Sequence, residues 1–351
     1  MSNIKKGPSR SKQALAKTLV LAGDMGGTKT DLALFSFKEG SFSIRKKAQF
    51  KNKDFSSPAA VIEAFLERCG EVDIAAATIG VAARIDGGRA SFTNLDWVVD
   101  ERELAARFGT GKVSLVNDLV AASWGLPMLG EDMFYCLQKG RRGEGNAVMV
   151  AAGTGLGEVI LNGRAGIFYP SASEGGHSDF APSGLVQQGL LAYLYAKFGH
   201  VSVERVVSGP GLKNIYDFLM NGRRPNPTLA DRFRMEDPSA VISEEAAKED
   251  GFKVCKEALD IFISALGAEA GNLALKTLPA GGVYIAGGIP WKIIKALRQE
   301  EETFMNAFRN KGRFSDYLGD LPVYVVLEPK VALYGAANHA YSRLTARPLS
   351  F

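Results

Sequence analysis

TLVLAGDMGGTKTDLALFSF, residues 18–37, contains two apolar segments on either side of a glycine-rich turn. Thr18 to Ala22 is a short aliphatic and β-branched run, which is typical of a buried strand. Asp31 to Phe37 alternates polar and apolar side chains, which indicates a second strand. The stretch therefore predicts a strand, a turn over Gly23 to Thr30, and a returning strand.

A second stretch of the same kind lies near the middle of the chain. Ala147 to Ala151 is an apolar run, Gly153 to Gly157 reads Gly-Thr-Gly-Leu-Gly, and Glu158 to Leu161 is again largely apolar. We interpret the two stretches as an internal duplication of one strand–turn–strand unit.

The rest of the chain alternates helical patterns with short strand patterns. Helices are predicted over residues 58–69, 100–108, 185–198, 211–220, 252–275 and 331–344, and strands over 74–81, 113–116, 283–286 and 323–327. Such alternation predicts an α/β fold. Residues 221–238 are rich in Pro, Asn, Arg and Asp, so we expect an exposed excursion there.

The two glycine turns suit the binding of phosphate groups. Glycines allow backbone N–H groups to approach phosphate oxygens without side chains in the way. A P-loop or a Rossmann turn would open a helix, whereas here each turn is followed by a strand. A simple hairpin turn is the alternative for either turn alone, but together they favour a polyphosphate cradle.

Two further features fit a nucleotide site. Asp24 lies where the first strand meets its turn, so its carboxylate is a candidate ligand for Mg²⁺, directly or through water; the alternative is a turn carboxylate that caps local N–H groups. Gly281-Gly282 and Gly287-Gly288 flank another buried strand. The second pair could let a purine lie against the backbone, or it could serve close strand–helix packing.

The charge of the chain argues against a nucleic-acid partner. The formal net charge is +4, but residues 1–17 hold five basic residues and no acid, which leaves 37 basic against 38 acidic residues in the remainder. The body therefore lacks the basic excess of a nucleic-acid binder. We interpret residues 1–17 as a flexible basic tail.

Cysteine usage and hydropathy indicate a reducing compartment. Cys69, Cys136 and Cys255 are widely spaced and form no CxxC pair, so we expect buried, reduced thiols rather than disulfides or zinc. We expect no membrane span and no signal peptide, because the apolar run after the basic N-terminus is short and continues into the first turn. These features predict a cytoplasmic protein.

Several short motifs together resemble the bacterial glucokinase family, which belongs to the actin/hexokinase/Hsp70-like ATPase superfamily. They are Asp24-Met-Gly-Gly-Thr28, Asn117-Asp118, Gly153-Thr-Gly-Leu-Gly157, Glu174-Gly-Gly-His177, Glu204-Arg-Val-Val-Ser-Gly-Pro-Gly211 and Gly287-Gly288. The Glu-Gly-Gly-His and Ser-Gly-Pro-Gly pieces are specific, whereas the first turn is shared across the superfamily. The matches run from about residue 18 to residue 340.

The resemblance implies an actin-like (ribonuclease H-like) fold of two α/β lobes with a cleft between them. We expect a small domain over residues 18–127 plus 329–351 and a large domain over residues 128–328. The resemblance also implies ATP with Mg²⁺, glucose as the acceptor, a role in the first step of glycolysis, and a homodimer.

The resemblance assigns roles residue by residue. Asp118 falls on the catalytic base, which would take the proton of the primary sugar hydroxyl; a helix N-cap is the alternative for Asn117-Asp118. Sugar contacts fall on Asn94, Asn117, Asp118, Glu174, His177 and Glu204. Nucleotide contacts fall on Gly23, Asp24, Gly26, Gly27, Thr28, Lys29, Gly153, Thr154, Gly155, Gly157, Gly287 and Gly288. For His177 a structural histidine is the alternative, and for Glu204 a surface ion pair.

The chain departs from the family pattern at two places and lacks the zinc motif of a related branch. Lys29 stands where some members have Asn, and Ala82-Ala83-Arg84 replaces an expected Gly-Pro or Cys-Pro step. Residues 171–179 contain no cysteine, so the related repressor/kinase branch with its zinc motif does not fit.

Other functions remain open at this point. A non-catalytic sugar sensor would need a DNA-binding segment, and residues 1–17 are too short for one. An actin- or chaperone-like ATPase would lack Glu174-Gly-Gly-His177. Another hexose, such as mannose, fructose or an N-acetylhexosamine, is an alternative acceptor, and ADP or polyphosphate an alternative donor.

Overall fold

The computed structural model describes residues 18–38, 41–92, 95–164, 167–224, 226–299 and 301–345. These residues form two compact units. The first contains the described residues up to Met128 together with those from Lys330 onward, and the second spans Leu129–Pro329. Each unit is built on one mixed β-sheet, so the predicted α/β class is confirmed.

The first unit has a five-stranded sheet in the order β3-β2-β1-β4-β8. Strands β3, β2 and β1 are antiparallel, and β1, β4 and β8 are parallel. The bounds are β1 Leu19–Met25, β2 Lys29–Lys38, β3 Ser41–Lys51, β4 Ile74–Val81 and β8 Val113–Asn117. The predicted first hairpin is therefore confirmed.

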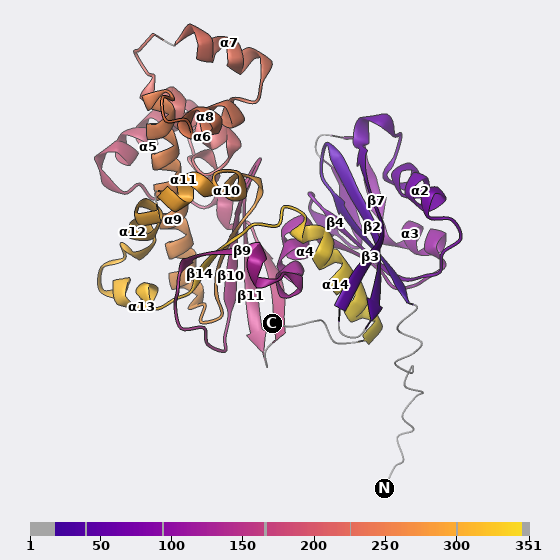
Figure 1. Cartoon of the computed structure of the whole chain (residues 1–351). Coiled ribbons are helices and arrows are strands. Elements are labelled where there is room, and N and C mark those ends of the chain that lie inside the picture. The colour runs from indigo at the N-terminus through magenta and orange to yellow at the C-terminus, as the bar shows by residue number, and fades with distance from the viewer. Residues whose placement is uncertain are drawn as a thin grey trace. The chain divides into compact units, whose positions relative to one another are not determined.

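Helices cover both faces of this sheet, as Figure 1 shows for α14 on one side and α2 and α3 on the other. Val20 and Ala22 of β1 pack with residues of α14, whereas Leu21 and Met25 pack with residues of α2. This two-residue alternation is the strand period. The bounds are α2 Pro58–Cys69, α3 Glu101–Phe108, α4 Asp118–Gly125 and α14 Val331–Thr345.

Shorter elements complete the first unit. A small antiparallel sheet has the order β5-β6-β7, with β5 Ile85–Asp86, β6 Arg89–Ser91 and β7 Val98–Asp100. Two 3-10 turns are η1 Asn52–Asp54 and η2 Leu126–Met128.

The second unit has a six-stranded sheet in the order β12-β11-β10-β13-β14-β9. Strands β12, β11 and β10 are antiparallel, and β10, β13 and β14 are parallel. The bounds are β9 Phe134–Gln138, β10 Ala147–Ala152, β11 Leu156–Arg164, β12 Ile167–Ser173, β13 Gly282–Ala286 and β14 Val323–Val326. Five of its strands repeat the order and directions of the first sheet, which confirms the predicted duplication and extends it beyond one hairpin.

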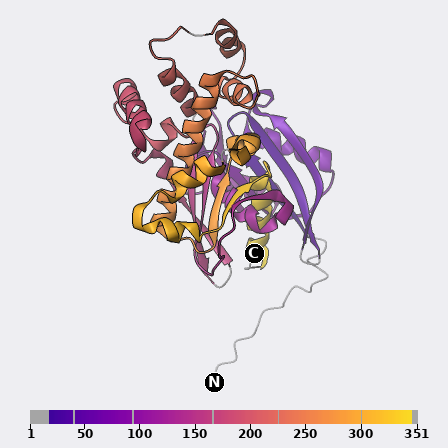
Figure 2. The same ribbon diagram turned by 60° about the vertical axis from the view of Figure 1, so that its left-hand side comes forward.

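Helix α9, Lys253–Thr277, is the central helix of the second unit. It packs against α6, α8 and α12, and Figure 2 shows α12 alongside it. By length and composition alone α9 could cross a membrane, but two thirds of its most apolar segment is buried inside the unit. The other helices are α5 Gly184–Phe198, α6 Gly209–Leu219, α7 Pro227–Met235, α8 Pro238–Ala246, α10 Gly288–Lys292, α11 Ile294–Gln299, α12 Glu301–Arg309 and α13 Ser315–Gly319. The 3-10 turns are η3 Glu131–Met133, η4 Gly175–His177, η5 Val203–Arg205 and η6 Gly312–Phe314.

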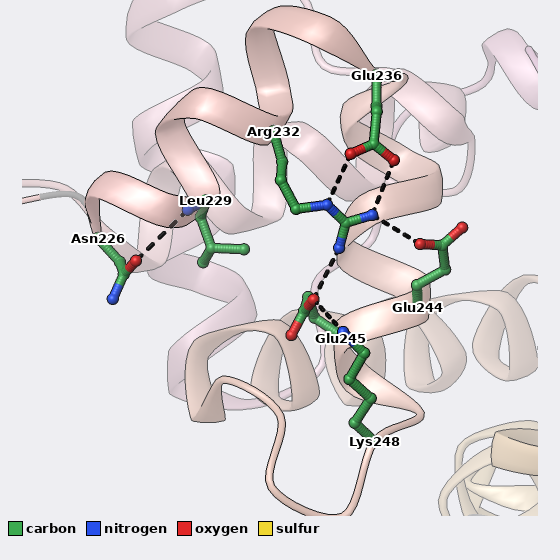
Figure 3. Close-up of polar contacts among 7 residues, drawn as sticks. All are labelled: Asn226, Leu229, Arg232, Glu236, Glu244, Glu245 and Lys248. Atoms are coloured by element: carbon green, nitrogen blue, oxygen red, sulfur yellow. Dashed lines mark hydrogen bonds and ion pairs between the residues drawn. The ribbon is translucent and has the colours of Figure 1, made fainter.

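The predicted excursion over residues 221–238 is largely exposed but contains helix α7. Figure 3 shows how this helix is held: the Arg232 guanidinium bonds Glu236 on one side and Glu244 and Glu245 of α8 on the other, each at 2.7 Å. Glu245 is buried, and it also pairs with Lys248 at 2.6 Å. Arg232 thereby fastens α7 to α8.

None of the three cysteines, all of which lie in the described residues, forms a disulfide. Cys255 is buried, as predicted, whereas Cys69 and Cys136 are only partly buried. The prediction of three buried thiols is therefore corrected for those two.

Candidate active site

The first glycine turn joins β1 to β2 and is open to solvent at its tip. Gly27, Thr28 and Lys29 are exposed. The turn is closed by the Gly26 N–H, which donates to the Lys29 carbonyl at 3.0 Å. Exposed N–H groups on a closed, glycine-rich turn are suited to meet phosphate oxygens.

Asn52 holds this turn in place through three hydrogen bonds. Its amide donates to the Gly26 carbonyl at 2.8 Å, and its oxygen accepts from the Thr30 hydroxyl at 2.8 Å. The Asn52 N–H also donates to the Thr28 carbonyl at 2.9 Å. Asn52 is 1% exposed, so a buried side chain at the start of η1, directly after β3, sets the shape of the turn.

Gly23 has a packing role in the structure. It lies inside β1, where an added Cβ would come within 2.7 Å of Ile79 and 3.0 Å of Leu32. Its predicted nucleotide contact stays a prediction. Gly26 and Gly27 lie nearer the open tip of the turn, where an added Cβ would meet no atom closer than 3.5 Å.

Asp24 lies at the end of β1 in an acidic environment. Burial, then the neighbouring Asp118 and Asp31, raise the pKa of the Asp24 carboxyl to about 7, and Lys330 opposes them. A buried carboxylate near other carboxylates resists ionisation because its charge is poorly solvated and repelled. A bound cation stabilises the ionised form of such a group in place of the proton, so Asp24 fits the role of a Mg²⁺ ligand.

Asn117 and Asp118 lie where β8 ends and α4 begins. Asn117 Oδ1 accepts from the Leu119 N–H at 3.0 Å and caps the helix, so the N-cap interpretation holds for Asn117. Asp118 Oδ1 also accepts from the Leu119 N–H, at 2.9 Å. Burial raises the pKa of Asp118, although hydrogen bonds from the Leu119 and Asp118 backbone and from the Asn117 side chain lower it. A fixed carboxylate of raised pKa suits a general base.

The second glycine turn joins β10 to β11 in the other unit. It is closed by the Gly153 N–H, which donates to the Gly155 carbonyl at 2.8 Å, and the Gly153 carbonyl accepts from Gly209 at 2.8 Å. Thr154 is exposed. The Ser-Gly-Pro-Gly motif at the start of α6 therefore contacts this turn.

Gly287 and Gly288 follow β13, which lies beside β10. Gly287 has a φ of 96°, and an added Cβ would overlap the Ala152 backbone. The Gly288 nitrogen is 3.9 Å from the position of an added Cβ at Gly153. The structure thus brings the second turn and the 287–288 pair together, as a phosphate and purine site would require. Gly287 also has the alternative role, because it packs closely against the Ala152 backbone.

Glu204 and the 174–177 segment lie next to the second turn. Glu204 Oε2 accepts from the Leu156 N–H at 2.9 Å, and its Oε1 is 4.0 Å from His177 Nδ1. His177 is 61% exposed in its side chain, and Glu174 is exposed. These three polar side chains are therefore available to a ligand with several hydroxyls.

The predicted residues fall into two groups, one in each unit. The first unit holds Gly23 to Lys29 with Asn117 and Asp118, and the second holds Gly153 to Gly157, Glu174, His177, Glu204, Gly287 and Gly288. Asn94 lies outside the described residues. No sequence pattern points to Asn52 or Lys330, because a buried amide and a distant lysine acquire their roles only through tertiary contacts.

Within the described part of the chain, no three His, Cys, Asp or Glu side chains gather as a metal cluster. Mg²⁺ commonly binds through one or two carboxylates, with waters and substrate phosphates completing its shell. Asp24 beside a phosphate-binding turn fits that mode.

The sequence matches the glucokinase family model over residues 21–343. This chain belongs to the glucokinase family. The glucokinase of Synechocystis is 37% identical over 90% of this chain and 96% of its own, and that of Nostoc punctiforme is 38% identical over 91% and 98%. The predicted family membership is confirmed.

The fold of this glucokinase family member is shared with solved relatives. The crystal structure of a glucokinase from an Antarctic psychrotroph superposes with a TM-score of 0.77 at 28% identity, covering 92% of this chain and 99% of that one. The predicted two-lobed, actin-like kinase fold is confirmed as a fold class.

Proposed function

We propose that this chain transfers the γ-phosphoryl group of ATP to the primary hydroxyl of glucose, giving ADP and glucose 6-phosphate. The observation that carries the proposal is the pair Asp24 and Asp118, which lie near the end of β1 and directly after β8 of one sheet, beside an open glycine turn. The charge of Asp118 contributes to the raised pKa of Asp24. Phosphoryl transfer needs positioning, a proton acceptor and neutralisation of charge.

Asp118 is the proposed base. The sugar oxygen forms a bond to the γ-phosphorus while the bond from that phosphorus to the β–γ bridging oxygen breaks. The proton of the hydroxyl passes to Asp118, and the electron pair leaves with ADP. Helix α4 holds the carboxylate at its first residue, so its position is set before substrate binds.

Asp24 is the proposed residue that holds Mg²⁺, directly or through water. The ion neutralises charge on the phosphates of ATP when it is bound. Asp24 itself holds a proton in competition with the cation, because burial and nearby carboxylates raise the pKa of Asp24 to about 7.

The sugar is held by hydroxyl-binding side chains. Glu174, His177 and Glu204 cluster beside the second turn, and Asn117 follows β8 in the first unit; Asn94 completes the predicted set. A site that bonds each hydroxyl discriminates against sugars that lack one. The N–H groups of Gly153 to Gly157 and the 287–288 pair are proposed to hold ATP.

The proposal extends to the division into a small and a large domain at the predicted bounds, and to a homodimer in the cytoplasm that performs the first step of glycolysis. Light scattering on the purified chain measures the oligomeric state directly.

The Asp118→Asn variant tests the central assignment. We expect glucose binding within a few-fold of wild type by calorimetry, and ADP release reduced by about 10³-fold or more, since the base is lost but the hydrogen-bonding shape is kept. A panel of hexoses and phosphoryl donors with the wild-type chain is the companion experiment. Substantial turnover by the variant would contradict the assigned base, and no ADP release with any hexose would contradict the kinase.

A further inference from the structure

Two buried glutamates lie beneath the 174–177 segment and have no part in the proposed chemistry. Glu158 lies on β11 and is 2% exposed, and Glu269 lies on α9 and is 4% exposed. Carboxylates this deeply buried normally have a cation or several donors as partners.

Each of these carboxyl groups has one oxygen without a hydrogen-bond partner. Glu158 Oε1 and Glu269 Oε1 are both buried and unpartnered in the structure. The two side chains lie within hydrogen-bonding range of one another. Two facing carboxyl groups are satisfied when they share one proton, because the protonated group then donates to the ionised one.

The surroundings of the pair assign the proton to Glu158. Glu269 Oε2 accepts from the Asn272 amide at 2.9 Å, and Asn272 Oδ1 accepts from Lys311 at 2.7 Å. This relay connects Glu269, through Asn272, to the ammonium group of Lys311. Burial, then Glu269, raise the pKa of Glu158 to about 7, and Lys276 opposes them.

Glu158 is in direct contact with the backbone of the 174–177 segment. An added Cβ at Gly175 would overlap Glu158 Oε2, and one at Gly176 would overlap the Leu156 carbonyl. The segment therefore rests on β11 with no spare space. Its own bonds run from the Gly175 N–H to Ser173 Oγ at 2.9 Å and from the His177 N–H to the Glu174 carbonyl at 3.0 Å.

We propose that Glu158 and Glu269 are positioning residues whose shared proton holds the Glu174–His177 segment in the shape that binds sugar. When the proton is lost, the two adjacent carboxylates repel each other, and a shift of Glu158 away from Glu269 disturbs the segment because Glu158 Oε2 already lies against Gly175. The segment is then displaced, and sugar affinity falls. This inference rests on the proposed role of Glu174 and His177 in sugar binding.

The charged groups around the pair are few. Lys276 and Lys311 face it from the side of α9 and η6, and His177 and Glu204 lie on the side of the sugar segment. Lys276 lowers the pKa of Glu158, but burial and the charge of Glu269 have the larger, opposite effect.

Glucose binding to the full chain, measured by calorimetry between about pH 6 and about pH 9, tests the inference. If only the singly protonated pair binds, the dissociation constant rises by up to about tenfold per pH unit above the pKa of the pair. At low pH, Glu158→Gln should bind glucose as the wild type does. Its dissociation constant should not rise with pH, because the side-chain amide of the variant can donate to Glu269 at every pH. A rise of the same size in Glu158→Gln would overturn the inference.

Glu245→Gln is the matched control, since Glu245 is a buried glutamate of the same unit in a different cluster (Figure 3). It should lower stability without changing the pH dependence of glucose binding.

Infrared spectroscopy reports the pair independently of any ligand. The difference spectrum of the wild type minus a Glu158→Gln/Glu269→Gln double variant should show a carboxylic-acid C=O band that titrates near neutral pH. The contribution of Asp24, whose pKa is also about 7, cancels because both proteins contain it. A wild type without this band overturns the shared proton. A band with no glucose binding at any pH would instead contradict the proposed function.

Discussion

Lys330 Nζ lies 2.8 Å from Asp31 Oδ1. This ion pair joins the residue before α14 to the start of β2. Asp31 is opposite Asp24 in the β1–β2 ladder. Lys330 is thus the cation that offsets the acidic group around Asp24, and it lowers the pKa that Asp24 would otherwise have.

Replacement of this lysine by methionine should raise the pKa of Asp24 further. Below that pKa Asp24 is protonated and cannot hold Mg²⁺, so we expect the KM for MgATP near neutral pH to increase, by up to about tenfold per unit of pKa change. The increase should vanish at alkaline pH, where Asp24 is ionised in both proteins. Lys330→Arg retains the charge and is the control; an equal loss at all pH values would contradict the electrostatic role.

Asn52→Ala should loosen the first glycine turn. It removes the bonds to the Gly26 carbonyl and the Thr30 hydroxyl, and leaving these groups without partners costs about 1–3 kcal/mol of unfolding free energy. The KM for ATP should rise more than the KM for glucose. Urea unfolding and steady-state kinetics measure the two effects. The exposed Asn162→Ala is the control, and a variant with unchanged KM for ATP would show that Asn52 does not shape the site.

The sequence predicted elements well where the signal is local. Strand β4 and helix α2 have the predicted bounds, because one is an unbroken apolar run and the other has Ser57 as N-cap and Pro58 in its first turn. Strand β3 was missed because it lies at the sheet edge and most of its side chains are exposed, which leaves no alternation to detect.

Helix α7 was missed although its start signal is present. Asn226 caps it through Oδ1, which accepts from the Thr228 N–H at 2.9 Å, and Pro227 follows at the first position. The many polar residues around it concealed this signal. The helix is held by burial of Leu229 in the core and by the Arg232 contacts with α8, and no local pattern encodes these contacts.

The candidate site was predictable only in part, because some of its residues show no local sequence signal. Glycine turns and the Asn117-Asp118 pair are contiguous motifs that a sequence displays. The roles of Asn52, Lys330 and Glu269 arise from contacts with residues distant in the chain, and their residue types are ordinary at those positions.

His339 predicts a loss of stability in acid. Its Nδ1 lies 3.0 Å from the Thr78 hydroxyl oxygen, and burial lowers the pKa of His339 to about 4. The unfolded chain binds this proton at about pH 6.5, so the contribution is complete above that pH and is lost as the pH falls toward about 4. The loss should reach up to about 3 kcal/mol. Urea unfolding of wild type and His339→Gln measures it; the variant should lack this part of the slope, and parallel slopes would contradict the assignment.

Gly155→Ala should weaken glucose binding by displacing Glu204, one of the proposed sugar contacts. An added Cβ at Gly155 would overlap Glu204 Oε2, the atom that accepts from the Leu156 N–H. Glu204 must then leave its position between the second turn and His177. Loss of one charge-assisted hydrogen bond corresponds to a rise in the KM for glucose of about ten- to one-hundred-fold. Gly111→Ala is the control, because nothing lies within 4 Å of its added Cβ. If Gly155→Ala binds glucose normally and its unfolding free energy is unchanged, the hydrogen bond between Glu204 and the Leu156 N–H does not position Glu204 for sugar binding.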